Sequence, residues 1–98
     1  MTLHTINKQT SDCVSHCLNA LAENDTVLLI EDGVYAAMTG CSAAEHWQQL
    51  PDGVTCLALA DELAARGIRG QIAATVQPAS WEEFVALCTQ HEKVISWG

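Results

Sequence analysis

The chain has 98 residues, a length that fits one domain with a modest core, so we expect a single domain over residues 1–98. Twelve acidic residues against four Lys and Arg give a formal net charge of −8, which argues against direct nucleic-acid binding because that binding depends on clustered cations. No apolar run approaches the roughly 20 residues of a membrane span, and five cysteines with neither a CxxC pattern nor a signal peptide favour free thiols in the cytoplasm.

Strand and helix signals alternate along the chain without a linker or a repeat. In chain order, the pattern predicts strand 3–7, helix 11–23, strand 26–30, a helical piece 34–39, helix 42–49, strand 54–59, helix 61–67, strand 71–76, helix 80–90 and strand 93–97. Strands separated by helices in this rhythm pair in parallel through right-handed crossovers. The sequence therefore predicts an α/β fold, a three-layer helix-sheet-helix domain with a mostly parallel sheet of about five strands.

The second predicted strand ends at an acidic pair. Its apolar run, residues 27–30, is typical of a strand that is buried on both faces, and Gly33 closes the break that follows it. Glu31 and Asp32 therefore lie at the carboxyl edge of the sheet, where sites collect in open α/β folds. Adjacent side chains point in different directions, so we expect Asp32 to cap the next helical piece instead of working with Glu31 as acid and base.

Serines mark three helix starts. Ser11 is placed to cap the first helix, and Ser42 and Ser80 each precede a glutamate by three residues, which is the capping-box pattern. In the last helix, the residues of an apolar stripe are expected to face inward; they are Trp81, Phe84, Val85 and Cys88.

The tryptophans differ in their surroundings. Trp47 and Trp81 fall on apolar helical stripes, so both are predicted core residues. Trp97 ends the last strand and is less easily buried within one domain. It is therefore predicted to be an interface anchor.

Three cysteines have simple structural interpretations. Cys56 within a strand and Cys88 on the inward stripe are predicted to be small buried apolar residues. Cys41 precedes a helix whose dipole would favour a thiolate, although an ordinary loop cysteine is the simpler interpretation.

Cofactor motifs are missing. The chain has no GxGxxG, GxxxxGK[ST] or HExxH pattern. Cys13, His16 and Cys17 stand close together in sequence, but two thiols and one imidazole leave a tetrahedral zinc site incomplete. We therefore expect neither a cofactor nor a metal.

Five segments carry a resemblance to a known family. They are LHTIN at residues 3–7, CLNALAE at 17–23, VLLIEDGVYAA at 27–37, LADELAARG at 59–67 and VISW at 94–97. In this order and at these distances they resemble the TusB/DsrH family over nearly the whole chain.

The resemblance implies a fold, partners and a process. It implies a DsrE/DsrF/DsrH-like fold and a heterohexamer with TusC/TusD-like subunits, which relays persulfide sulfur from a TusA-like donor to a TusE-like acceptor. The product would be 2-thiouridine at the tRNA wobble position. The main catalytic cysteine of such a complex belongs to the TusD- or DsrE-like partner, so this chain would be a noncatalytic or auxiliary subunit.

Cys17 is the candidate catalytic residue that the resemblance implies. DsrH-type members carry a cysteine in the first helix, and Cys17 falls at that position. Core packing is the default for a cysteine on an apolar helix face, so we expect a sluggish thiol unless assembly opens a pocket there.

Two alternatives stay open. The chain could be a DsrH-like subunit of a DsrE/DsrF/DsrH-type complex in cytoplasmic sulfur oxidation, with Cys17 as a persulfide carrier. It could also be a homo-oligomeric α/β binding module without sulfur chemistry, which would leave the five matching segments unexplained.

Overall fold

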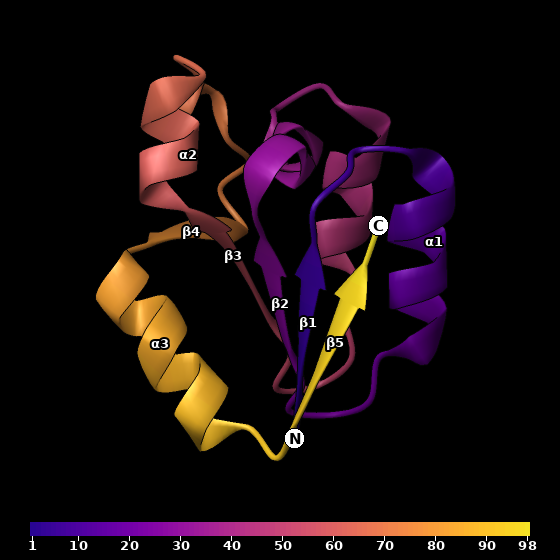
Figure 1. Cartoon of the computed structure of the whole chain (residues 1–98). Helices are drawn as coiled ribbons and strands as arrows, with labels where there is room; N and C mark the ends of the chain where they lie inside the picture. Colours follow the sequence, from indigo (N-terminus) through magenta and orange to yellow (C-terminus); the bar gives the residue numbers. More distant parts are fainter.

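Five strands form one sheet, parallel throughout, in the order β4-β3-β2-β1-β5 (Figure 1). The strands are β1 (Thr2–Ile6), β2 (Thr26–Leu29), β3 (Thr55–Leu59), β4 (Val76–Ala79) and β5 (Lys93–Trp97). The α-helices are α1 (Ser11–Ala20), α2 (Ala60–Ala65) and α3 (Trp81–Gln90), and the 3-10 helices are η1 (Glu31–Ala37), η2 (Ser42–Gln48) and η3 (Arg69–Gln71). This computed structural model describes the backbone of residues 1–98 and all side chains except those of Ser11, Ser42 and Ala44. The predicted α/β fold is confirmed.

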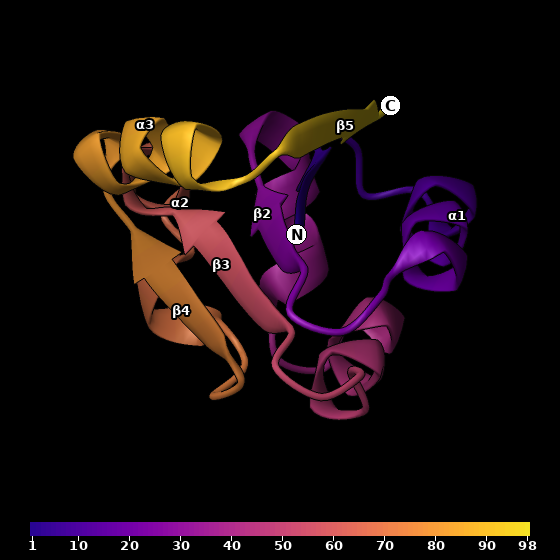
Figure 2. The same ribbon diagram turned by 90° about the horizontal axis from the view of Figure 1, so that it is seen from below.

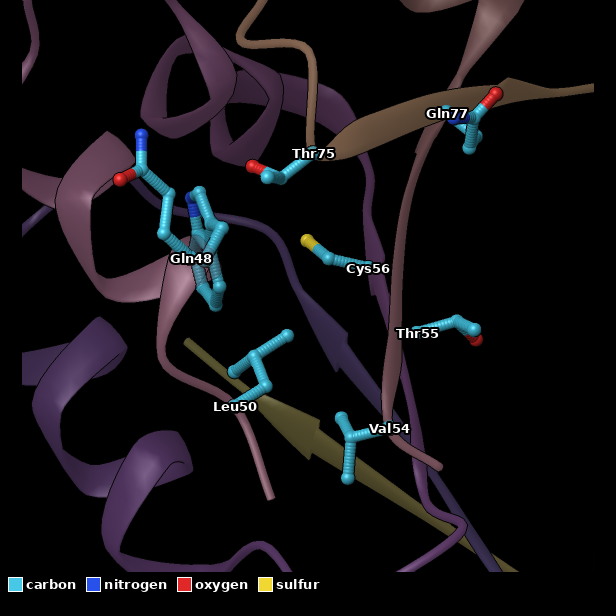
Figure 3. Close-up of a pocket in the computed structure, with 8 residues that line it drawn as sticks. Gln48, Leu50, Val54, Thr55, Cys56, Thr75 and Gln77 are labelled. Carbon is cyan, nitrogen blue, oxygen red and sulfur yellow. The ribbon is translucent and has the colours of Figure 1, made fainter. Parts of the chain in front are cut away.

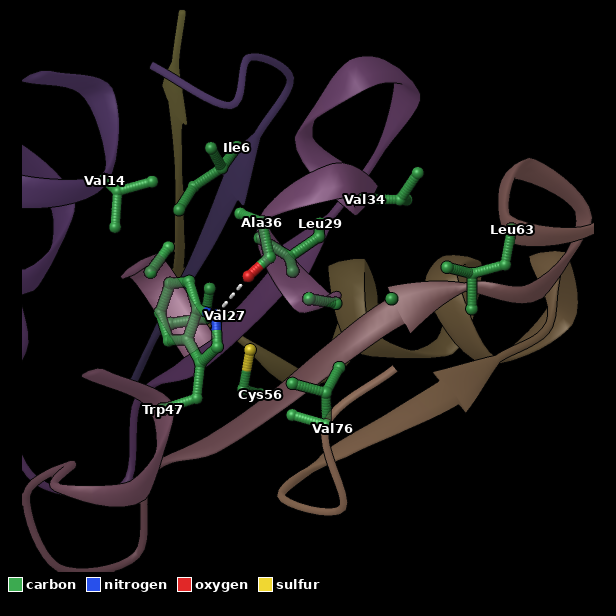
Figure 4. Close-up of a cluster of buried hydrophobic side chains, with 14 of the residues drawn as sticks. Ile6, Val14, Val27, Leu29, Val34, Ala36, Trp47, Cys56, Leu63 and Val76 are labelled. Atoms are coloured by element: carbon green, nitrogen blue, oxygen red, sulfur yellow. Dashed lines mark hydrogen bonds between the residues drawn. The ribbon is translucent and has the colours of Figure 1, made fainter. Parts of the chain in front are cut away.

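Helices cover both faces of the sheet, which confirms the three layers (Figure 2). What we call the first face packs against α1, α2, η1 and η2, and its strands contribute Ile6, Val27, Leu29, Cys56, Ala58 and Val76 to one buried cluster (Figure 4). The second face packs against α3, through a smaller cluster built on Leu3, Leu28, Leu59 and Ala79. The middle strand β2 is buried along its whole length, as its apolar sequence predicts.

The first helix ends earlier than predicted. It stops at Ala20 because the Asp25 carboxylate accepts the backbone N–H of Ala22 at 3.0 Å and Asn24 adopts a left-handed φ of 66°. At the other end, the Thr10 hydroxyl accepts the N–H of Cys13 at 3.4 Å. The side chains of Ser11 and Ser42, which were predicted to be caps, lie outside those that the structure describes.

The fourth strand lies further along the chain than the sequence predicts. Residues 71–76 were predicted to form it, but η3 ends at Gln71, and Ile72 makes an isolated antiparallel bridge with Met38. The ladder with β3 begins only at Val76, opposite Cys56. This strand contains Pro78, which an edge strand tolerates because one side of its backbone has no partner in the sheet.

The last helix is rotated relative to the predicted stripe. Its capping box is confirmed, since Ser80 accepts the N–H of Glu83 at 3.1 Å and Glu83 accepts the N–H of Ser80 at 3.2 Å. Phe84 packs against the second face as expected, together with Leu87.

The rest of the predicted stripe is wrong, because Trp81, Val85 and Cys88 are exposed. Two hydrogen bonds of His91, the residue after the helix, help to set this rotation: Nδ1 donates to Leu87 O at 2.8 Å, and Nε2 accepts from the Thr26 hydroxyl at 2.9 Å.

Gly33 allows η1 to begin directly beside the end of β1. A Cβ at this position would overlap the carbonyl oxygen of Ile6, so only glycine fits without moving the backbone. That same Ile6 oxygen accepts the N–H of Ile30 at 2.9 Å, which ties the ends of β1 and β2 together.

Among the described helices, none reaches the length and apolar character that a membrane crossing requires.

Candidate functional site

Cys17 lies on the face of α1 that packs against the sheet. It is fully buried and belongs to the same cluster as Ile6, Val27 and Trp47. Burial raises the pKa of the Cys17 thiol to about 12, and the nearby Asp25 carboxylate adds to the rise. Almost all of the group is therefore protonated at neutral pH, and a protonated thiol is a poor nucleophile for sulfur transfer.

Cys56 lies on β3 behind a surface pocket of about 380 Å³ (Figure 3). Its sulfur points toward the side on which Gln48 and Thr75 lie, but only 2% of the residue is exposed. Burial raises the pKa of this thiol too, and the neighbouring Cys17 contributes to the shift. The prediction that Cys56 is a buried apolar residue is confirmed.

The other three thiols are more accessible. Cys13 and Cys41 are partly buried, and Cys41 lines a second pocket, of about 490 Å³, together with Glu45 and Ile72. Cys88 is exposed, so the prediction that it is buried was wrong. The most reachable thiol in the fold is therefore one that helical periodicity assigned to the core.

Trp97 is joined to His4 and Asp25 by a chain of hydrogen bonds. The indole Nε1 of Trp97 donates to His4 Nδ1 at 3.1 Å, and the two rings are stacked with centroids 6.2 Å apart. An indole N–H can only donate, so His4 Nδ1 accepts and Nε2 donates to Asp25 Oδ2 at 2.9 Å. Trp97 is therefore partly buried by contacts within its own chain, and its interface role stays a prediction.

Asp25 is the charged end of this chain of hydrogen bonds. Burial alone would raise its pKa, but hydrogen bonds from His4, from the backbone N–H of Ala22 and from that of Thr2 outweigh burial and hold the pKa below its ordinary value. The group is thus a satisfied buried carboxylate that pins the turn before β2. The sequence carried no local signal for it, because His4 and Asp25 lie 21 positions apart.

Arg66 joins two of the segments that carry the family resemblance. Its guanidinium donates to Asp32 at 2.9 Å and also to Glu62, and it stands 5.8 Å from the centre of the Tyr35 ring. The hydrogen bond to Asp32 raises the pKa of Arg66 further above its ordinary value.

The predicted capping role of Asp32 is wrong, because η1 has no side-chain cap and this carboxylate pairs with Arg66. Nothing in the described residues gathers three or more His, Cys, Asp or Glu side chains into a possible metal site.

The fold defines a class of small α/β proteins built on one sheet. The solved structure of the ychN protein from E. coli superposes with a TM-score of 0.74 at 12% identity, covering 98% of this chain and 97% of that one. A protein of unknown function from Methanobacterium thermoautotrophicum gives a TM-score of 0.76 at 18% identity, covering 97% and 96%. At these identities the likeness shows the fold alone.

Sequence comparison narrows the class to one family. The family model described as DsrH like protein matches residues 9–94. Protein TusB from Enterobacter sp. (strain 638) is 33% identical over 96 residues, which is 97% of this chain and 99% of that protein. Protein TusB from Escherichia coli O139:H28 is 36% identical over 80 residues, which is 82% of each chain. The chain belongs to the TusB/DsrH family, as its five segments predicted.

Proposed function

We propose that this chain is a subunit of a TusBCD-like sulfur-relay complex that supports 2-thiouridine synthesis at the wobble position of tRNA. One observation carries the proposal: the similarity to Protein TusB extends over 97% of the chain. In this role it works in the cytoplasm as one domain, in a heterohexamer with TusC/TusD-like subunits. The assembled complex passes persulfide sulfur from a TusA-like donor to a TusE-like acceptor.

The chain acts in this complex as an auxiliary subunit. Cys17, the thiol at the position that the resemblance implies, is buried and protonated, which is the opposite of what a relay cysteine needs. We expect other components to hold the tRNA, since a chain with four Lys and Arg against twelve acids has few cations to contact phosphates. One of those four, Arg66, is already engaged by two carboxylates.

A gene deletion with complementation tests this function. Deleting the gene is expected to lower the 2-thiouridine content of tRNA, measured by mass spectrometry of nucleosides, and both the wild-type gene and Cys17→Ser are expected to restore it. The wild-type chain is also expected to co-purify with the TusC- and TusD-like chains of the same organism. Unchanged 2-thiouridine after deletion would overturn the proposal.

Cys17 supports a second candidate function, that of a persulfide carrier in a DsrH-like complex of sulfur oxidation. Its position in α1 is the observation that favours this role, and its burial means that α1 must move before a donor can reach the sulfur. Incubating the assembled complex with a persulfide donor tests it. A mass increase of about 32 Da, one sulfur atom, that disappears in Cys17→Ser supports this function, and its absence from the wild type rules it out.

A further inference from the structure

We propose that one side of α3, together with the neighbouring part of β5, is the surface on which an unlike partner chain docks through an apolar patch with a basic rim. We call this surface the α3 flank and define it by Trp81, Val85, Cys88 and Val94. The inference rests on the proposed function, because the sister subunits of the sulfur-relay complex are the partners that it names.

The α3 flank gathers most of the exposed large apolar side chains. Exposure reaches 49% at Trp81, 62% at Val85 and 45% at Val94, and among the described side chains only Met1 adds to this group. Helix α3 itself has no buried residue, although Phe84 and Leu87 pack against the second face. An amphipathic helix that buries so few of its apolar side chains against the sheet leaves apolar surface that another molecule can cover.

The side of α3 that carries the flank can be identified from the side that faces the sheet near β3. Glu83, Ala86 and Gln90 line a shallow pocket together with Leu57 of β3, so that side of α3 faces β3. Helical spacing places residues 81, 85 and 88 together on the other side of the helix.

Val94 is paired in register with Leu3 of the second-face cluster, so it adds an exposed apolar side chain on the same face of the sheet. No helix lies over β5 on this face (Figure 2). The α3 flank thus combines exposed apolar side chains of a helix and of an edge strand on the same face of the sheet.

The charges beside the flank favour an unlike partner chain over a second copy of this chain. Outside the side that faces β3, helix α3 carries Glu82 and no cation, Glu92 follows the helix, and Lys93 is the first cation after it in the chain. Two copies of this chain meeting through the flank would bring these carboxylates together, on molecules that each carry a net charge of −8. A partner with Lys and Arg around an apolar centre complements the surface instead, and the exposed indole of Trp81 is the kind of anchor that dominates such contacts.

Point variants in the complex test this surface. The wild-type chain and Val85→Glu are each titrated against the purified TusC- and TusD-like chains of the same organism. Val85→Glu is expected to weaken assembly by about tenfold or more, and Glu82→Lys is expected to weaken it and to reduce its salt dependence. Gln90→Glu is the matched control, because it adds the same charge to the same helix on the opposite side and should leave assembly unchanged.

Each outcome separates the docking surface from the proposed function. If the wild type assembles and Val85→Glu binds equally well, the α3 flank is not the interface, whereas the sulfur-relay role stands. If the wild type does not bind the sister chains at all, both are overturned. Hydrogen exchange adds a readout without mutation, since residues 81–88 should become protected in the complex, and unchanged exchange there overturns the docking surface alone. Self-association through the flank would overturn the choice of an unlike partner.

Discussion

The indole N–H of Trp97 donates to His4 Nδ1 at 3.1 Å across a separation of 93 residues. Because His4 in turn donates a hydrogen bond to Asp25, one chain of hydrogen bonds connects β5, β1 and the turn before β2. The same geometry fixes the tautomer of His4, with its proton on Nε2. These residues therefore stabilise three parts of the sheet together, and their removal should affect the whole domain.

Replacing Trp97 with phenylalanine tests this connection. Trp97→Phe keeps an aromatic ring but leaves the buried His4 Nδ1 without a donor, so we expect the free energy of unfolding to fall by about 1 to 3 kcal/mol. Urea denaturation measures the change. Trp81→Phe is the control, because the ring is half exposed and makes no hydrogen bond in the described structure; its effect should stay within about 0.5 kcal/mol. Equal effects of the two variants would contradict the hydrogen-bonded role of Trp97.

Because of Asp25, the free energy of unfolding is expected to depend on pH. Its pKa is lowered in the folded state, so its contribution is present above the unfolded value of about 4 and is lost as the pH falls through the lower folded value. Asp25→Asn should therefore cost about 2 kcal/mol at pH 7, and the gap to the wild type should shrink steadily below about pH 4. Urea denaturation of both proteins from pH 7 to 3 measures the gap. A gap that is constant over this range would mean that Asp25 is not a stabilised carboxylate.

The five thiols should react with an alkylating reagent in an order set by burial. We expect Cys88 to be modified first, Cys13 and Cys41 more slowly, and Cys17 and Cys56 only after unfolding. Timed treatment with iodoacetamide at neutral pH, followed by peptide mass spectrometry, measures this order. Modification of Cys17 as fast as that of Cys88 would show that α1 opens readily, and would favour the persulfide-carrier function.

Gly33→Ala should destabilise the domain by more than about 1 kcal/mol, since the new methyl group would overlap the Ile6 carbonyl oxygen and force β1 away from η1. Gly70→Ala is a matched control, because its Cβ would meet open space and its φ is not positive. Thermal or urea unfolding compares the two variants. Similar stabilities would show that the backbone moves apart at Gly33 without cost.

The strands in the interior of the sheet were predictable, because a strand that is buried on both faces needs a continuous run of apolar residues. The apolar run of β2 and the apolar character of Cys56 in β3 are of this kind. The edge strand β4 has a weaker apolar pattern, since half of its residues face solvent and it contains a proline. Its predicted position was wrong for that reason.

The rotation of α3 was not predictable from periodicity. Six of its ten residues are apolar, so the pattern fits several orientations toward the sheet. The hydrogen bond that helps to choose one of them joins His91 to Thr26, 65 positions away. The hydrogen bonds that join His4 to Trp97 and to Asp25 are also non-local, which is why the sequence predicted the strands but not this network.

The position of β1 between β2 and β5 has a consequence for how the protein is made. The first strand of the sheet in chain order is hydrogen-bonded on one side to the last strand, from Thr2 opposite Lys93 to Ile6 opposite Trp97. Until translation has passed that point, the edge of β1 stays open and Trp97 is absent, so nascent chains expose a strand edge that other chains could pair with. The sheet is therefore expected to complete its folding only after β5 has been synthesised, and truncated chains that lack β5 should aggregate.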